Sequence, residues 1–119
     1  MQPKVIHTTT ASGAVRRIFS PGSLGFKIMN QYYRLDVTFD YPNSYWIIFA
    51  DETSGDETYG GGRLIGVEKP DERGTTVIDF NKAFNLPCVL SEYYSCPLPP
   101  PQNMLPIKVT AGEKKYKNK

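Results

Sequence analysis

Hydrophobic and polar residues alternate with a period of two along much of this chain. Between residues 32 and 39, the apolar side chains of Tyr33, Leu35, Val37 and Phe39 are separated by more polar neighbours. This alternation is typical of a strand with one buried face. Residues 24–28 show the same pattern, and we expect a hairpin that turns at Asn30 and Gln31.

Other segments predict further strands. Residues 45–49 are continuously apolar, which indicates a strand buried on both faces. Residues 63–68 and 75–80 predict a second hairpin, joined by a turn over 69–74. We also expect a first strand at 15–19 and a last one at 105–110, where Pro106 favours an edge position. Residues 81–85 could form one helical turn.

These patterns predict an all-β, mainly antiparallel domain of about seven short strands with at most one short helical turn. Short connections between strands favour a small closed meander that resembles a barrel, or a sandwich. We expect a loose N-terminal segment at 1–14, a single β domain at 15–112 and a basic, frayed tail at 113–119. A chain of 119 residues is the size of one domain.

Composition and charge narrow the possible partners. The net charge of +2 is unevenly distributed along the chain. Residues 107–119 hold five lysines and one glutamate, and the remainder of the chain has a net charge of −2. Residues 51–72 hold seven acids and two bases, which would repel a phosphate backbone, so we expect no nucleic-acid partner. No run of residues has the length and hydropathy of a membrane span or a signal peptide, which predicts a cytoplasmic protein without a membrane partner. The sequence does not indicate an oligomeric state.

Four segments break the strand pattern and carry unusual residues. Residues 51–63 read DETSGDETYGGGR, 79–88 read DFNKAFNLPC, 96–103 read CPLPPPQN and 111–114 read AGEK. Together, in this order, they resemble the signature of the uncharacterised domain-of-unknown-function family 1684 of bacteria and archaea. The resemblance covers about residues 18–116. It implies no reaction, because no activity is established for that family.

The chain departs from the family pattern at two places. Leu64 and Ile65 follow the arginine, where relatives often have an aromatic residue, and Leu86 replaces the first proline of a pair. Many relatives also have an additional N-terminal region that resembles a forkhead-associated domain.

Hairpin geometry predicts that three of the unusual segments meet at one end of the sheet. Arg63 begins one strand of the expected second hairpin, and Asp79 and Asn81 lie at the end of the other strand. Asp51 would join them if strand 45–50 runs antiparallel beside 63–68. Converging polar groups at such a rim are typical of a small-molecule site. The candidate ligand-binding residues are Asp51, Thr58, Tyr59, Arg63, Asp79, Asn81 and Asn85.

A structural role for the same residues is the main alternative. An arginine paired with aspartate and flanked by asparagines can tie down long loops through charge-assisted hydrogen bonds. The simplest register also places Arg63 opposite Phe80, on the other face from Asp79.

Other motifs predict structure rather than chemistry. Gly60–Gly62 precede a strand without a following Gly-Lys-Ser/Thr, which disfavours a phosphate loop. The chain has two cysteines, Cys88 and Cys96, and one histidine, His7. These are too few ligands for a typical zinc site, so we expect structural cysteines and no metal. Residues 97–101 favour a polyproline II strap on the domain's own surface.

The sequence therefore favours a small binding module that holds a small polar or anionic molecule, with no cofactor. The alternatives are a small hydrolase or lyase that uses Asp51 and Asp79 as acid and base, or a purely structural or interaction domain. No catalytic residue is assigned.

Overall fold

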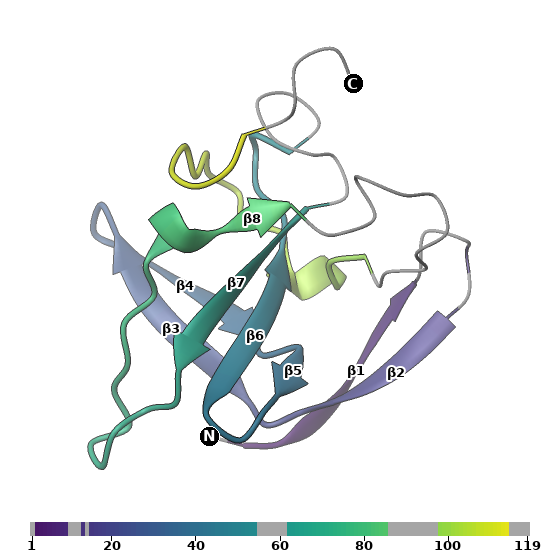
Figure 1. Cartoon of the computed structure of the whole chain (residues 1–119). Helices are drawn as coiled ribbons and strands as arrows, with labels where there is room; N and C mark the ends of the chain where they lie inside the picture. The colour runs from purple at the N-terminus through teal and green to yellow at the C-terminus, as the bar shows by residue number, and fades with distance from the viewer. Residues whose placement is uncertain (1, 10–12, 14, 55–61, 86–97, 115–119) are drawn as a thin grey trace.

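The computed structural model describes residues 2–9, 13, 15–54, 62–85 and 98–114. It confirms an all-β domain: the strands are antiparallel and form three separate sheets, shown in Figure 1. In the described residues, the helical elements are 3-10 turns such as η1 (Phe80–Lys82) and η3 (Pro101–Asn103). The three sheets do not close into a barrel there, so the closed form expected from the sequence is not observed.

The first sheet is a hairpin of β1 (Lys4–Thr9) and β2 (Val15–Ser20), paired along their whole length. Residues 4–9 lie within the N-terminal segment that was expected to be loose. They form a strand because Ile6 and Thr8 alternate with exposed residues and are buried, as Ile18 is across the sheet. Pairing with β2 satisfies their backbone groups.

The second sheet is the expected hairpin, with β3 (Ser23–Ile28) antiparallel to β4 (Gln31–Asp36). Its turn lies one residue earlier than expected, at Met29 and Asn30, which have φ values of 50° and 67°. Two successive residues of positive φ match the twist of the flanking strands.

The third sheet has the order β5-β6-β7-β8, formed by β5 (Phe39–Asp40), β6 (Ser44–Phe49), β7 (Arg63–Glu68) and β8 (Phe84–Asn85). The expected pairing of β7 with residues 75–80 is wrong. Arg63 pairs with Asn85 and Leu64 with Phe84.

Residues 75–79 are instead extended without pairing in a sheet. The Asp71 carboxylate accepts from the backbone N–H groups of Arg73 and Thr75, and the Thr76 hydroxyl bonds the Glu68 carbonyl. These side-chain bonds replace the ladder that a hairpin would need. Ile78 and Phe80 still pack on the core, which explains the strand-like pattern.

Residues 105–110 do not form the expected last strand. The segment runs beside the end of β6 through one parallel bridge between Ala50 and Met104. The Leu105 N–H donates to the Ala50 carbonyl, and the Glu52 N–H donates to the Ile107 carbonyl. Pro106 between them has no N–H to continue a ladder.

The main core lies between β3–β4 and the four-stranded sheet. Leu35, Val37, Ile47, Phe49 and Ile65 are each fully buried. Residues 98–114 close the end of this core, which brings the last motifs of the sequence against β6 and β7.

Candidate functional site

The Arg63 guanidinium is enclosed by the protein. Arg63 begins β7 and is 1% exposed. Its Nη2 donates to the Val109 carbonyl at 2.8 Å, and its Nη1 donates to the carbonyls of Ala111 at 2.5 Å and Glu113 at 3.4 Å. One side chain thus holds the carbonyls of three alternate residues of the C-terminal segment.

Asp51 completes the charge balance of this cluster. Its Oδ2 lies 3.5 Å from Arg63 Nη2 and accepts from the Val109 N–H, while Oδ1 accepts from the Thr53 hydroxyl at 2.7 Å. Burial lowers the pKa of Arg63, and the neighbouring Asp51 carboxylate partly offsets that effect. The Arg63 ion remains charged because an ordinary arginine pKa lies far above neutrality.

Gly112 makes the approach to Arg63 possible. It has a φ of 87°, and a Cβ there would lie 2.7 Å from the Phe80 carbonyl oxygen and 3.0 Å from Arg63 Nη1. The glycine of the AGEK segment therefore allows the backbone to wrap around the guanidinium.

The structure separates the other predicted site residues into two groups. Asn85 joins the Arg63 cluster: its Nδ2 donates to the Lys114 carbonyl at 3.2 Å, and its N–H donates to Glu113 Oε1 at 2.7 Å. Its Oδ1 is buried and has no hydrogen-bond partner among the described residues. Asp79 instead caps η1 by accepting from the Asn81 N–H, and Asn81 is exposed. Thr58, Tyr59, Cys88 and Cys96 lie outside the described residues.

A second buried network surrounds Asp36 at the end of β4. Lys4 Nζ lies 2.9 Å from its Oδ1, Gln102 donates to its Oδ2 at 2.9 Å, and the Ser23 hydroxyl bonds Oδ1. Burial raises the pKa of Asp36, but these hydrogen bonds and the Lys4 charge together lower it below its ordinary value.

Asn103 ties the same network to the four-stranded sheet. It is fully buried, accepts from the Asp36 N–H at 2.7 Å and donates to the carbonyls of Asp36 and Ile48, both at 2.9 Å. The asparagine that ends the CPLPPPQN segment thus joins β4 to β6.

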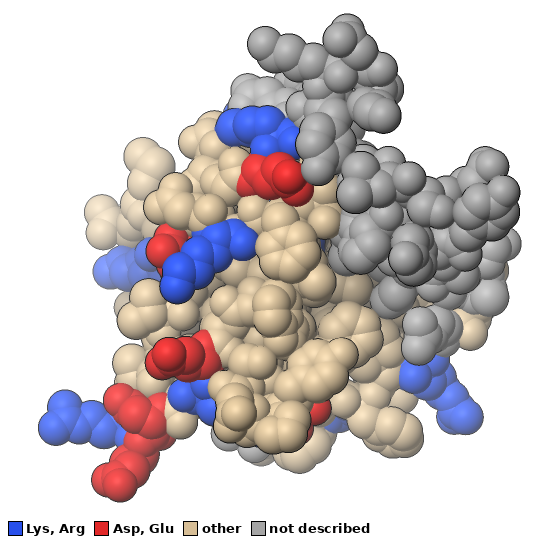
Figure 2. Space-filling model, in the orientation of Figure 1, with Lys and Arg blue, Asp and Glu red and all other residues tan. Residues whose placement is uncertain are grey.

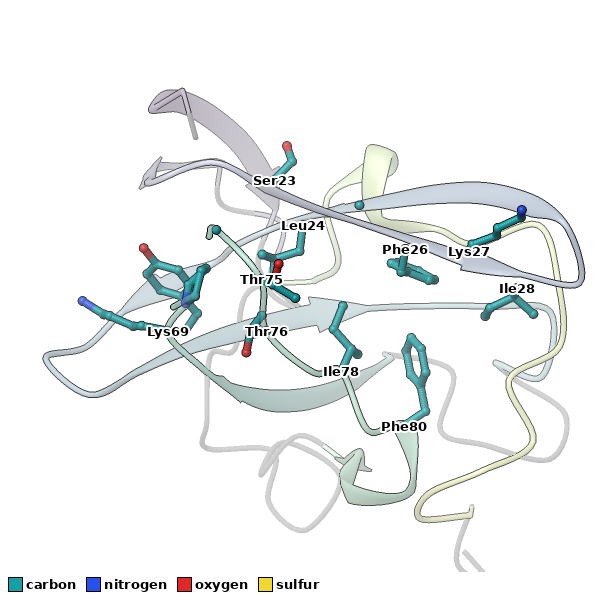
Figure 3. Close-up of a pocket in the computed structure, with 14 residues that line it drawn as sticks. Ser23, Leu24, Phe26, Lys27, Ile28, Lys69, Thr75, Thr76, Ile78 and Phe80 are labelled. Atoms are coloured by element: carbon teal, nitrogen blue, oxygen red, sulfur yellow. The ribbon is translucent and has the colours of Figure 1, made fainter. Parts of the chain in front are cut away.

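A groove of about 800 Å³ lies between β3 and residues 69–80. In Figure 3, Leu24, Phe26 and Ile28 of β3 lie on one side, and Ile78 and Phe80 lie on the other. The rings of Phe26 and Phe80 meet edge to face at 5.7 Å, and they form an apolar floor. Lys27, Lys69, Thr75 and Thr76 add polar groups to the rim.

A second hollow of about 640 Å³ lies on the other side of segment 75–79, over the outer face of β6 and β7. Trp46 packs against Gly66 and meets Phe84 edge to face at 6.0 Å. Figure 2 shows mainly uncharged side chains over β6 and β7, with charged groups of both signs scattered around them. This face carries no patch of a single sign among the described residues.

Comparison with known proteins identifies the family. A family model described as "Protein of unknown function (DUF1684)" matches residues 1–114. The chain belongs to the DUF1684 family. The solution NMR structure of an uncharacterized protein from Haloarcula marismortui is similar to this DUF1684 chain, with 30% identity and a TM-score of 0.74. The match covers 99% of this chain and 67% of the archaeal one. No curated protein matches the sequence.

The DUF1684 motifs mainly hold the domain together where the structure describes them. Asp51, Arg63, Asn103 and Gly112 all make buried contacts between distant segments. The groove, in contrast, was not predictable from the sequence because it involves two segments of ordinary composition. Its available signal was Gly25, a glycine inside an otherwise regular strand. Within the described residues, no helix has the length and hydropathy needed to cross a membrane.

Proposed function

We propose that this DUF1684 domain is a non-catalytic binding module whose ligand occupies the groove between β3 and segment 69–80. The observation that carries the proposal is the combination of an apolar floor with cationic and hydroxyl groups around it. Such a lining suits a ligand with an apolar body and a polar or anionic group. This proposal keeps the small polar or anionic ligand that the sequence predicts and assigns it to the groove.

The buried Arg63 cluster supports moving the proposed site from the predicted rim to the groove. The guanidinium already bonds three carbonyls and faces Asp51. A ligand anion would have to displace these bonds and leave buried carbonyls without donors, which costs free energy. Among the described members of the predicted set, Asn85 has a buried side-chain oxygen without a hydrogen-bond partner.

The hydrolase or lyase alternative receives less support. It needs the carboxylates of Asp51 and Asp79 in one cavity. Asp51 is 7% exposed and bonded to Thr53 and Val109, whereas Asp79 caps η1 and lines the second hollow. A cytoplasmic location also stays a prediction from the sequence.

Charge reversal at two matched lysines tests the proposal. Lys27 lines the groove, and Lys82 lines the second hollow; both are exposed. We expect amide chemical shifts along β3 and residues 74–78 to respond to phenylacetate or phenyl phosphate. Lys27→Glu should weaken the affinity obtained from these shifts about tenfold because the nearby charge changes sign. Lys82→Glu should leave the affinity unchanged. Equal behaviour of the two variants, or shifts clustered elsewhere, would contradict the proposed site.

A further inference from the structure

Within the described part of the chain, the outer edge of β3 has backbone groups without a hydrogen-bond partner. Among the described residues, β3 pairs with β4 alone. The two-residue turn makes Ile28 and Gln31 a hydrogen-bonded pair, and the pattern alternates from there. The N–H and C=O groups of Ser23, Gly25 and Lys27 therefore point away from β4, toward the groove.

The opposite wall of the groove includes residues 76–78, which belong to no helix or strand. Residues 76–78 take part in no backbone–backbone hydrogen bond within the described part of the chain. The rings of Phe26 and Phe80 meet between the two walls, as Figure 3 shows. Two side chains that meet end to end hold their backbones farther apart than the spacing of about 4.8 Å between paired strands. The gap therefore suits one additional strand above an aromatic floor.

Nothing in the described part of the chain requires a glycine at position 25. A Cβ at this position would meet one atom, the Tyr33 carbonyl oxygen, at 3.9 Å, and its φ is not positive. Glycine inside a strand destabilises that strand relative to alanine. Glycine in such a place often marks the close approach of a ligand or a second backbone.

Charge around Gly25 selects the kind of strand that would bind. Arg34 is opposite Gly25 on β4, and Lys27 is the next residue of β3 on the same face; both are exposed. The acid on this face of the hairpin, Asp36, is buried and paired with Lys4. Since Gly25 has no side chain, an acidic residue on an added strand could reach across it toward Arg34, about 9.6 Å away at two strand spacings.

We propose that the groove binds an extended acidic peptide, which adds to the edge of β3 as a new strand. This inference rests on the proposed function of the same groove and names its ligand class. Alternate apolar side chains of the peptide pack on Leu24, Phe26 and Ile78, and its acidic side chains lie beside Lys27 and Arg34. Backbone hydrogen bonds to Ser23, Gly25 and Lys27 supply affinity for any sequence of this pattern.

The test uses a capped hexapeptide of alternating valine and glutamate with the full chain. Binding is measured by calorimetry, and amide hydrogen exchange is followed by NMR. We expect slower exchange at the Gly25 and Lys27 amides on binding. Methylation of the peptide's alternate backbone nitrogens should abolish binding, and a lysine-for-glutamate peptide should fail to bind. Arg34→Glu should weaken binding about tenfold, whereas Arg17→Glu, at an exposed arginine of β2, should not.

The other outcomes each overturn the inference in a recognisable way. Peptide binding that survives N-methylation, or that leaves exchange at Gly25 and Lys27 unchanged, would exclude strand addition. If phenylacetate still binds in the groove but the peptide does not, the proposed function stands and the peptide is wrong. If neither binds, both fail. Concentration-dependent protection of the β3 edge without peptide would make a second copy of this chain the occupant instead.

Discussion

Buried charged side chains join parts of the chain that are far apart in sequence. Arg63 bonds carbonyls from Val109 to Glu113, and Asp36 bonds side chains of Lys4 and Gln102. Such groups stabilise a domain only while all their partners are present, because an unpaired buried charge is costly.

Replacing Arg63 should therefore reduce stability strongly. Arg63→Ala leaves Asp51 and three carbonyls without their donor, and we expect a loss of about 3–5 kcal/mol in the free energy of unfolding. Arg63→Lys should lose a large part of this, since one ammonium cannot reproduce the planar fork. Urea unfolding measures both, and Arg73→Ala, in the exposed turn, is the control with a change below about 0.5 kcal/mol. An Arg63→Ala variant as stable as the parent would show that the cluster is dispensable.

Asp36 should make stability depend on acid pH. Its pKa is lowered in the folded protein, whereas an unfolded aspartate titrates near 3.9. The contribution is therefore complete above the unfolded pKa and is lost as the pH falls through the lower folded pKa. Asp36→Asn should lower the free energy of unfolding by about 1–3 kcal/mol at pH 7. The difference in this free energy between variant and parent should shrink below about pH 4. Unfolding curves from pH 7 to 3 test this; a constant difference would contradict it. Asp40→Asn, at an exposed pair with Lys69, should change little at either pH.

At the scale of elements, one glycine determines how the C-terminal segment packs. Gly112 and Gly74 both have positive φ, but a Cβ at Gly74 would meet nothing within 4 Å. Gly74→Ala should therefore cost about 1 kcal/mol of backbone strain, while Gly112→Ala should cost clearly more because it also displaces the Phe80 carbonyl. Thermal melting of the two variants separates strain from steric overlap. Equal melting temperatures would show that the segment moves without cost.

Asn103 should behave as a structural connector between sheets. Asn103→Ala removes three buried hydrogen bonds to Asp36 and Ile48, for which we expect a loss of about 2–4 kcal/mol. Gln102→Ala, whose exposed side chain gives Asp36 one bond, should cost about 1 kcal/mol. Denaturant titration compares them, and a larger effect at Gln102 would reverse our assignment.

The elements were predictable where one local pattern decided the structure. The alternation over 24–28 and 32–36 gave the β3–β4 hairpin because each strand buries one face. The same pattern failed over 75–80, where side chains of Asp71 and Thr76 took up backbone groups and Phe84 replaced the expected partner. The contact of Asp51 with Arg63 was predictable because the two residues lie at the ends of adjacent strands. The carbonyl acceptors of Arg63, in contrast, lie in a segment that reaches Glu113, about 50 residues later in the sequence. No local rule indicates such a contact.

At the scale of the whole molecule, the sheets should differ in stability. β1 and β2 form a two-stranded sheet at one side of the domain, whereas β6 and β7 are central strands with fully buried residues. Isolated two-stranded sheets are marginal, so we expect β1 and β2 amides to exchange with solvent well before those of β6 and β7. Native-state hydrogen exchange at low denaturant concentration measures this order. Simultaneous exchange of both would show one cooperative unit.

The arginine that begins β7 also sets when this protein can fold during synthesis. Its carbonyl partners lie at residues 109–113, and Asn103 joins β4 to β6 from the same end of the chain. A nascent chain on the ribosome that has exposed β1 to β8 still lacks these partners, so Arg63 would enter the core unpaired. The long-range contacts must wait for the C-terminal segment. Folding of this core is therefore completed only after residues 98–114 have left the ribosome, and a chain truncated before them should remain a substrate for chaperones and proteases.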